Sequence, residues 1–135
     1  MTETSNGTGG APPENPSHPI TMLAFVTRNE NLSVEEFQKH WIEKHGPLVG
    51  GFLSSKGVLS YRQFHIDQSN NPLGYDGVVQ LQIPSLETWA KISSDKYYQD
   101  VVVPDEQRFF QAAKMVILTG KNYSVVEGGQ YVLNK

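Results

Sequence analysis

The sequence of 135 residues contains no cysteine. This absence excludes disulfide bonds, thiolate metal ligands and cysteine nucleophiles. Long apolar runs are also missing, since none approaches the roughly 18 residues that a membrane-spanning helix requires. The first residues lack the charged segment and apolar core of a signal peptide. We therefore expect a soluble, cytoplasmic protein with no membrane partner.

Positive charge is scarce as well. The chain has 11 Lys and Arg against 14 Asp and Glu, which gives a formal net charge of −3. No cluster of basic residues interrupts this balance, whereas a surface that binds nucleic acid normally needs one. We therefore expect no nucleic-acid partner.

Three common functional motifs are absent: HExxH, a Gly-rich loop joining a strand to a helix, and Gly-x-Ser-x-Gly. Their absence argues against a zinc protease, a nucleotide-binding enzyme and the commonest type of serine hydrolase. His40 and His45 are five residues apart, so on a helix they cannot hold one ion as an i, i+4 pair can. We expect neither a metal nor another cofactor.

The composition changes sharply near His18. Residues 1–19 are rich in Ser, Thr, Asn, Gly and Pro, and have too little apolar surface to offset the entropy of ordering. We predict a disordered tail there, in which His18 has no function. Residues 20–126 form one predicted domain, and residues 127–135 form a C-terminal extension.

Local patterns predict the elements of this domain. Residues 20–28 form an apolar run typical of a buried strand. Ser33 with Glu36 three residues later is a capping box, which begins a helix that continues to about residue 54. Pro47 removes one backbone donor, so this helix either bends or restarts there.

The remaining segments complete a known arrangement. We predict strands over 58–66, 75–83 and 114–126, a helix over 86–93 and a short helix after Pro104. The order βαββαβ is that of a ferredoxin-like α+β fold, a four-stranded antiparallel sheet with helices on one face. The second face of such a sheet would be apolar here, so we expect a homodimer with two sheets packed together, a dimeric α+β barrel.

An ionisable ring lies on the apolar side of the first predicted helix. At 100° per residue, one narrow stripe contains Val34, Phe37, Trp41, Leu48 and Phe52. His45 falls inside that stripe, and His40 falls on its flank. Such a ring is either a structural core histidine with hydrogen-bonded nitrogens or the centre of a functional site.

Other candidate residues also have two interpretations. Phe37 and Trp41 are either ordinary core or a flat wall for an aromatic ligand. Tyr61 and His65 share one face of their strand and could enter the same cleft, although a strand end at His65 could simply be solvated. Asp76 either orients a histidine or caps the turn before its strand.

Three stretches together resemble a known family. "LSVEEFQKHWIEKHGPLV", "GVLSYRQFHI" and "YDGVVQLQIPSLETW" are similar to the EthD-like group of dimeric α+β barrels, over about residues 21–124. The helix that ends in His-Gly-Pro-Leu-Val is the most specific part. The resemblance implies a cofactor-free enzyme of polyketide-type secondary metabolism, which cyclises, dehydrates or decarboxylates an aromatic or polyene substrate.

The resemblance also implies roles for individual residues. His45 matches the family histidine, and desolvation would keep its imidazole neutral and able to take a proton in an apolar cavity. The other catalytic candidates are Asp76, at a position where the family has an acid, with Tyr61 and His65. The candidate substrate-binding residues are Phe37, Trp41, His40, Tyr97 and Tyr98.

Two alternative functions stay open. Related barrels include haem-binding and cofactor-free oxygen-using proteins, which suggests the first alternative. The second is a non-catalytic binding or stress protein with the same dimeric fold. In plant polyketide cyclases of the superfamily the working histidine and tyrosine lie on and after the second helix. The comparable stretch here, "WAKISSDKYYQ", has no histidine, so that mechanism cannot be transferred intact.

Overall fold

The computed structural model describes residues 19–133 of the chain. The predicted disordered tail therefore lies, apart from Pro19, outside the described residues, as does His18.

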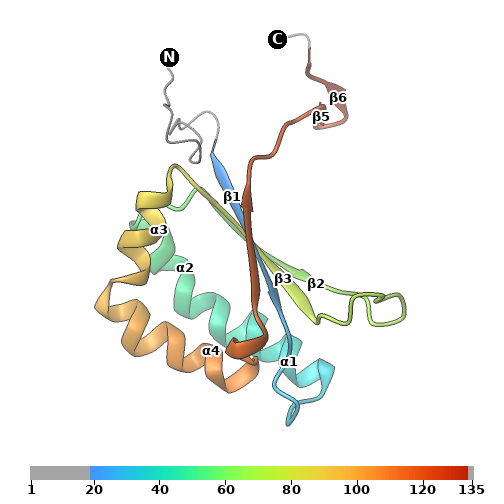
Figure 1. Cartoon of the computed structure of the whole chain (residues 1–135), viewed down its shortest axis with the longest axis vertical. Coiled ribbons are helices and arrows are strands. Elements are labelled where there is room, and N and C mark those ends of the chain that lie inside the picture. The colour runs from blue at the N-terminus through green and yellow to red at the C-terminus, as the bar shows by residue number, and fades with distance from the viewer. Residues whose placement is uncertain (1–18, 134–135) are drawn as a thin grey trace.

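A four-stranded antiparallel sheet forms one layer of the fold (Figure 1). Its strands are β1 (Ile20–Val26), β2 (Ser60–His65), β3 (Gly77–Ile83) and β4 (Val116–Gly120). Their spatial order is β2-β3-β1-β4, and all neighbouring pairs are antiparallel. The predicted ferredoxin-like arrangement is confirmed.

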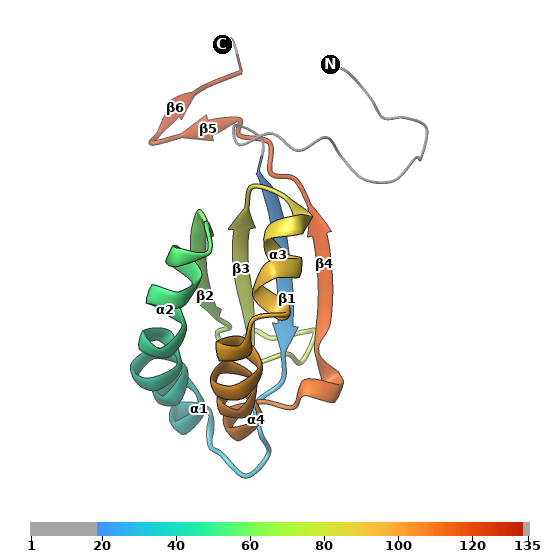
Figure 2. The same ribbon diagram turned by 90° about the vertical axis from the view of Figure 1, so that its left-hand side faces the viewer.

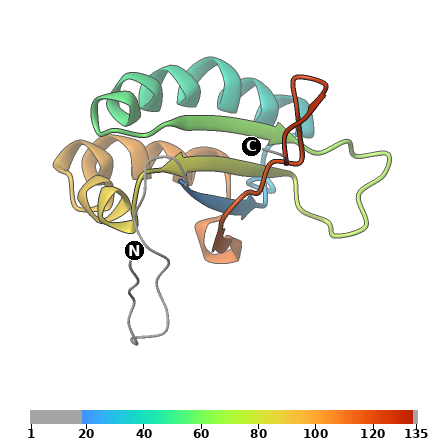
Figure 3. The same ribbon diagram turned by 90° about the horizontal axis from the view of Figure 1, so that it is seen from above.

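The helices cover one face of this sheet (Figure 2). They are α1 (Val34–His40), a π-helical turn η1 (Trp41–His45), α2 (Gly46–Ser55), α3 (Leu86–Ser93), a second π-helical turn η2 (Tyr98–Val102), α4 (Val103–Phe109) and a 3-10 turn η3 (Ala112–Lys114). The loop between β2 and β3 projects away from the two layers (Figure 3). None of the helices in the described part of the chain is long and apolar enough to cross a membrane.

The first helix begins as predicted and restarts at Pro47. Ser33 and Glu36 form the capping box: the Ser33 amide donates to Glu36 Oε1 at 2.8 Å, and the Glu36 amide donates to Ser33 Oγ at 3.1 Å. Gly46 begins α2, and Pro47 lies in its first turn, where a missing donor costs no helical hydrogen bond.

The turn η1 changes which side chains face the sheet. A π-helical turn contains an additional residue, so it rotates the following helix relative to a continuous α-helix. The prediction that Leu48 belongs to the buried stripe is therefore wrong, whereas Phe52 is half-buried and packs against the core. Val49 and Leu53 are buried instead. His45 keeps its predicted inward position and is only 4% exposed.

A glycine in β3 allows the Trp41 ring to lie against the sheet. A Cβ atom at Gly77 would lie 2.4 Å from Trp41 Cζ3, which is closer than real Cβ contacts. Any larger residue at this position would displace the indole. The "YDG" sequence thus contributes to the position of the tryptophan.

The end of the chain differs from the prediction. The last sheet strand was predicted over 114–126, but β4 ends at Gly120. Beyond it, β5 (Val126–Glu127) and β6 (Gln130–Tyr131) form a small hairpin outside the sheet (Figure 1). Its two turn glycines have positive φ angles, as a two-residue hairpin turn of this kind requires.

The face of the sheet away from the helices carries polar side chains, including Arg62 and Gln80, beside an apolar patch. Phe64 on β2 is 53% exposed and Leu118 on β4 is 52% exposed. Leu118 is paired with Leu23 of β1, and Val116 with Phe25, on the same face. A second copy of the chain could cover this patch, so the homodimer stays a prediction, with this patch as its expected interface.

Candidate active site

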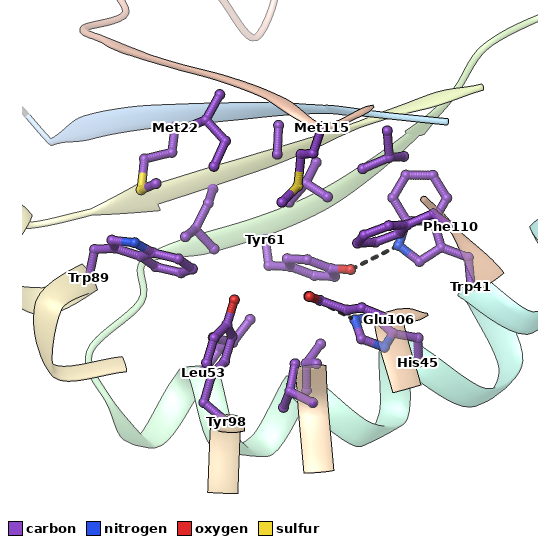
Figure 4. A pocket seen from close by; sticks show the side chains of 17 residues that line it. Met22, Trp41, His45, Leu53, Tyr61, Trp89, Tyr98, Glu106, Phe110 and Met115 are labelled. Carbon is purple, nitrogen blue, oxygen red and sulfur yellow. Dashed lines mark hydrogen bonds and ion pairs between the residues drawn. The ribbon is translucent and has the colours of Figure 1, made fainter. Parts of the chain in front are cut away.

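An apolar cavity of about 90 Å³ lies between the sheet and the helices (Figure 4). All four sheet strands contribute to it, through side chains on their helix-facing side. Its walls are largely aromatic or aliphatic, and include Trp41, Trp89, Phe110, Met22 and Met115. Its polar side chains are His45, Tyr61, Tyr98 and Glu106. Few, converging polar groups in an apolar cavity are typical of a small-molecule site.

His45 lies in this cavity with both ring nitrogens near a carboxyl group. Its Nδ1 is 2.8 Å from Asp105 Oδ2, and its Nε2 is 3.8 Å from Glu106 Oε2. Because a carboxylate only accepts, the hydrogen bond to Asp105 assigns the proton of the neutral ring to Nδ1. The Nε2 atom then has a free lone pair next to Glu106.

Asp105 is buried and is held by three donors. Besides His45, His40 Nε2 donates to Oδ1 at 3.0 Å, and Arg108 Nη1 lies 3.4 Å from the same oxygen. Burial by itself would raise the pKa of Asp105, but the hydrogen bonds from His45 and His40 outweigh it and hold the pKa below its usual range. Asp105 therefore remains a carboxylate and fixes the orientation of the His45 ring.

His45 and Glu106, which face each other in the cavity, are both shifted toward their neutral forms. Burial lowers the pKa of His45, even though the hydrogen bond and charge of Asp105 act to raise it. Burial, together with the negative charge of Asp105, raises the pKa of Glu106 to about 7. Near neutral pH the site therefore holds a neutral imidazole beside a carboxyl that is partly protonated.

Tyr61 is oriented as a hydrogen-bond donor to the cavity. Its hydroxyl oxygen accepts from Trp41 Nε1 at 3.2 Å and from Gln63 Nε2 at 3.3 Å. With both acceptor positions used, the O–H group remains available to a ligand. Burial raises the pKa of Tyr61, so this group stays protonated. Figure 4 shows the Tyr98 hydroxyl and the Glu106 carboxyl directed toward the same space.

Four of the predicted site residues line the cavity: His45, Tyr61, Trp41 and Tyr98. Two others support its wall from behind. Phe37 packs against Trp41 with ring centroids 5.4 Å apart. His40 stacks on Phe109 at 4.7 Å and holds Asp105, so it acts on the site through other residues rather than by touching the cavity.

His65 is placed behind the Trp41 ring rather than in the cavity. The two rings are 4.6 Å apart, and His65 Nε2 donates to Gln63 Oε1 at 2.9 Å. Burial lowers the pKa of His65, and its Nδ1 has no hydrogen-bond partner among the described residues. These contacts position Trp41 and Gln63, and through them the Tyr61 hydroxyl.

Asp76 and Tyr97 lie outside the cavity, where they connect elements of the fold. Asp76 Oδ2 accepts from the Arg28 amide at 2.8 Å, which ties the start of β3 to the end of β1. The Tyr97 hydroxyl donates to the Leu48 carbonyl at 2.8 Å. The structure does not bring either residue to His45.

The sequence reasoning missed Asp105 and Glu106. Both follow Pro104 in the first turn of α4, where acidic residues commonly stabilise a helix N-terminus. Stabilisation of the helix N-terminus accounts for both acids. No residue pattern near them in the sequence indicates that α4 packs beside His45. Within the described residues, no group of three or more His, Cys, Asp or Glu is arranged to hold a metal ion.

Several curated proteins are similar to this chain over most of their length. The dehydratase ustZ of Ustilaginoidea virens is 24% identical over 124 residues, which cover 82% of this chain and 87% of the relative. The conidial pigment biosynthesis dehydratase EthD of Metarhizium robertsii is 25% identical over 126 residues, covering 84% and 87%. The decarboxylase claH of Passalora fulva is 21% identical over 126 residues, covering 84% and 80%.

Solved structures share the fold. An EthD family protein from Bacillus halodurans has a TM-score of 0.59 at 14% identity, covering 78% of this chain and 99% of its own. A dimeric ferredoxin-like protein from Thermobifida fusca has a TM-score of 0.57 at 10% identity, covering 78% and 92%.

A family model described as the EthD domain matches residues 29–113. This range includes His45, Asp105 and Glu106, and it is more than half of the chain. The predicted resemblance is confirmed: the chain belongs to the EthD family.

Proposed function

We propose that the chain is a cofactor-independent lyase of secondary, polyketide-type metabolism, in which His45 transfers a proton of an aromatic or polyene substrate. The names of the similar curated proteins support a dehydratase or a decarboxylase in general. Among the three predicted reactions, they favour dehydration or decarboxylation over cyclisation.

One observation carries the proposal: His45 Nδ1 is bound to the Asp105 carboxylate, while Nε2 faces the cavity beside Glu106. A carboxylate that holds one nitrogen of an imidazole fixes the tautomer and stabilises the imidazolium that forms when the other nitrogen takes a proton. This is the arrangement that a general base needs.

The rest of the cavity supplies binding and polarisation. Trp41, Trp89 and Phe110 offer flat apolar surface, which suits an aromatic ring or a conjugated chain. The Tyr61 hydroxyl can donate to a carbonyl oxygen of the substrate and stabilise negative charge that develops there. Water would be largely excluded once such a substrate occupied the apolar cavity.

Two probes that yield the same product test the proposal. 3-Hydroxy-1-tetralone gives 1-naphthol by loss of water, and 1-hydroxy-2-naphthoic acid gives 1-naphthol by loss of carbon dioxide. We expect the purified protein, without added cofactor, to release 1-naphthol from one of them faster than buffer does. The His45→Gln variant should lose roughly 10²–10⁴-fold of that rate. Its folding is compared with the parent by circular dichroism.

Conversion of neither probe, or an unchanged rate in the Gln variant, would contradict the proposal. The two alternative functions, a haem-binding barrel and a non-catalytic carrier, would then be tested. A haem-binding barrel would show a Soret band when the protein is incubated with haem. A non-catalytic carrier would bind 1-naphthol, measured through the fluorescence of Trp41 and Trp89 in the cavity wall, and convert nothing.

A further inference from the structure

Glu106 is a carboxyl group in a place where carboxyl groups are rarely found. It is, within the part of the chain that the structure describes, the one acidic side chain that lines the apolar cavity. Its side chain is 20% exposed, and Glu106 Oε2 lies 3.8 Å from Nε2 of His45, whose ring is neutral near pH 7. Removing a carboxyl group from water without a cation beside it costs free energy. Carboxyl groups in such places are often functional.

The polar atoms around the cavity form a complementary set. His45 Nε2 is an acceptor, since its proton is on Nδ1. The Tyr61 hydroxyl is a donor, since its acceptor positions are occupied. Glu106 in its protonated form is a second donor, adjacent to the acceptor. A base, an acid and a carbonyl-polarising donor are the three groups that elimination next to a ketone requires.

We infer that this site removes water from an uncharged β-hydroxy ketone, with His45 Nε2 as the base and Glu106 as the acid that protonates the leaving hydroxyl. The inference rests on the proposed lyase function and narrows it to one of the two reactions that the relatives suggest.

The proton and electron transfers balance within the site. His45 Nε2 takes the proton from the carbon next to the ketone, and the electrons of that C–H bond form an enolate held by the Tyr61 hydroxyl. The enolate then forms the carbon–carbon double bond as the C–O bond to the hydroxyl breaks. Glu106 gives its proton to that oxygen, which leaves as water.

The distance between the two groups also explains how the site is restored. After one turnover His45 carries the extra proton and Glu106 is ionised. Because His45 Nε2 and Glu106 Oε2 are 3.8 Å apart, the proton can return directly after a small movement, or through one water molecule. No other proton source is required.

The charges of the cavity favour an uncharged substrate. None of the described residues that line it is Lys or Arg, so a substrate carboxylate would find no cation to bind. Asp105 is a carboxylate directly behind His45 and would repel such an anion. A decarboxylase must bind a carboxylate, whereas a β-hydroxy ketone offers only neutral oxygens to the two donors.

The two probes with the common product 1-naphthol separate the possibilities. We expect 3-hydroxy-1-tetralone to be converted and 1-hydroxy-2-naphthoic acid to be left unchanged. Glu106→Gln, which keeps the shape but cannot donate a proton, should slow dehydration at least 100-fold. Glu43→Gln is the matched control, because Glu43 is exposed on η1, and it should keep the parent rate.

A pH profile of dehydration distinguishes proton donation from a structural role. The parent rate should fall above about pH 7, where Glu106 loses its proton. In Glu106→Asp, which keeps a carboxyl group, a slower reaction with the same alkaline fall is expected. The residual dehydration rate of Glu106→Gln should not decrease above pH 7, because this variant has no carboxyl group to lose a proton.

The other outcomes separate a failure of this inference from a failure of the proposed lyase function. If only the carboxylic acid is converted, and His45→Gln stops that reaction, the inference is overturned while the proposed lyase function stands. If 3-hydroxy-1-tetralone is converted equally by Glu106→Gln and the parent, the assignment of Glu106 as the acid is overturned. Conversion of neither probe counts against the inference and the proposed function together.

Discussion

The Nδ1 atom of His45 and the Oδ2 atom of Asp105 lie 2.8 Å apart, although the residues are 60 positions apart in the sequence. This contact joins the π-helical turn η1 to the start of α4. It fixes the imidazole of His45, and it leaves the second nitrogen directed to Glu106. The properties of the proposed site follow from this one relationship, and the predictions below test its consequences.

Asp105→Asn should change the pH dependence of catalysis as well as its rate. The hydrogen bond and charge of Asp105 raise the pKa of His45 against the effect of burial. Without that charge the pKa of His45 falls further, so the acid limb of the rate profile moves to lower pH. The rate at neutral pH should also fall, about 10- to 100-fold, because the tautomer is no longer fixed.

Dehydration of 3-hydroxy-1-tetralone measured from pH 4 to 9 would follow both effects. Asp100→Asn, on an exposed position of η2, serves as the control and should keep the parent profile. An acid limb that stays at the parent pH in Asp105→Asn would argue against the role of Asp105.

Glu106→Gln should stabilise the protein in a pH-dependent way. The pKa of Glu106 rises from 4.5 in the unfolded chain to about 7 in the fold, so its ionised form is disfavoured by folding. This destabilisation is absent below pH 4.5 and complete above about pH 7. At about 1.36 kcal/mol per unit of pKa, it amounts to at most about 3 kcal/mol.

The free energy of unfolding by urea, measured at pH 4.5 and pH 8 for parent and variant, tests this expectation. The variant should gain stability relative to the parent only as the pH rises. A difference that is the same at both pH values would mean that Glu106 ionises normally in the folded protein.

Tyr61→Phe should separate the role of the hydroxyl from that of the ring. The ring still fills the cavity wall, but the donor to the substrate is lost, and Trp41 Nε1 and Gln63 Nε2 lose an acceptor. We expect a fall in rate of at least 10-fold and a loss of about 1 kcal/mol of stability. Tyr97→Phe removes a comparable hydrogen bond, to the Leu48 carbonyl, outside the cavity. It should lose stability but keep its activity per folded molecule.

The proposed homodimer depends on the apolar patch on the outer face of the sheet, where Leu118 and Phe64 are exposed. Light scattering of the parent should give about twice the chain mass of 15.1 kDa. Leu118→Glu, at a position 52% exposed on that face, should give a monomer, because a charge would be buried without a partner. Ile42→Glu is the matched control, since Ile42 is 56% exposed but lies on η1, away from the outer face of the sheet. A parent monomer, or dissociation by both variants alike, would refute this interface.

Much of the fold could be predicted because its signals are local. The capping box at Ser33 and the apolar run of β1 indicate their elements within a few residues. The inward position of His45 also follows from helical periodicity. The periodicity failed after His45, beyond the π-helical turn, where Val49 is buried in place of Leu48. A turn of this kind depends on the packing of the finished helix, and no local residue pattern announced it.

The sequence by itself determined the order of the elements, the family and four of the residues that line the cavity: His45, Tyr61, Trp41 and Tyr98. These depend on residue types and spacings within short segments. Only the tertiary structure decided that Asp105 and Glu106 meet His45, and that Asp76 and His65 stay outside the cavity. The reason is physical: α4 reaches His45 because both helical segments bury their apolar sides on the same face of the sheet. The resulting neighbours cannot be read from either segment alone.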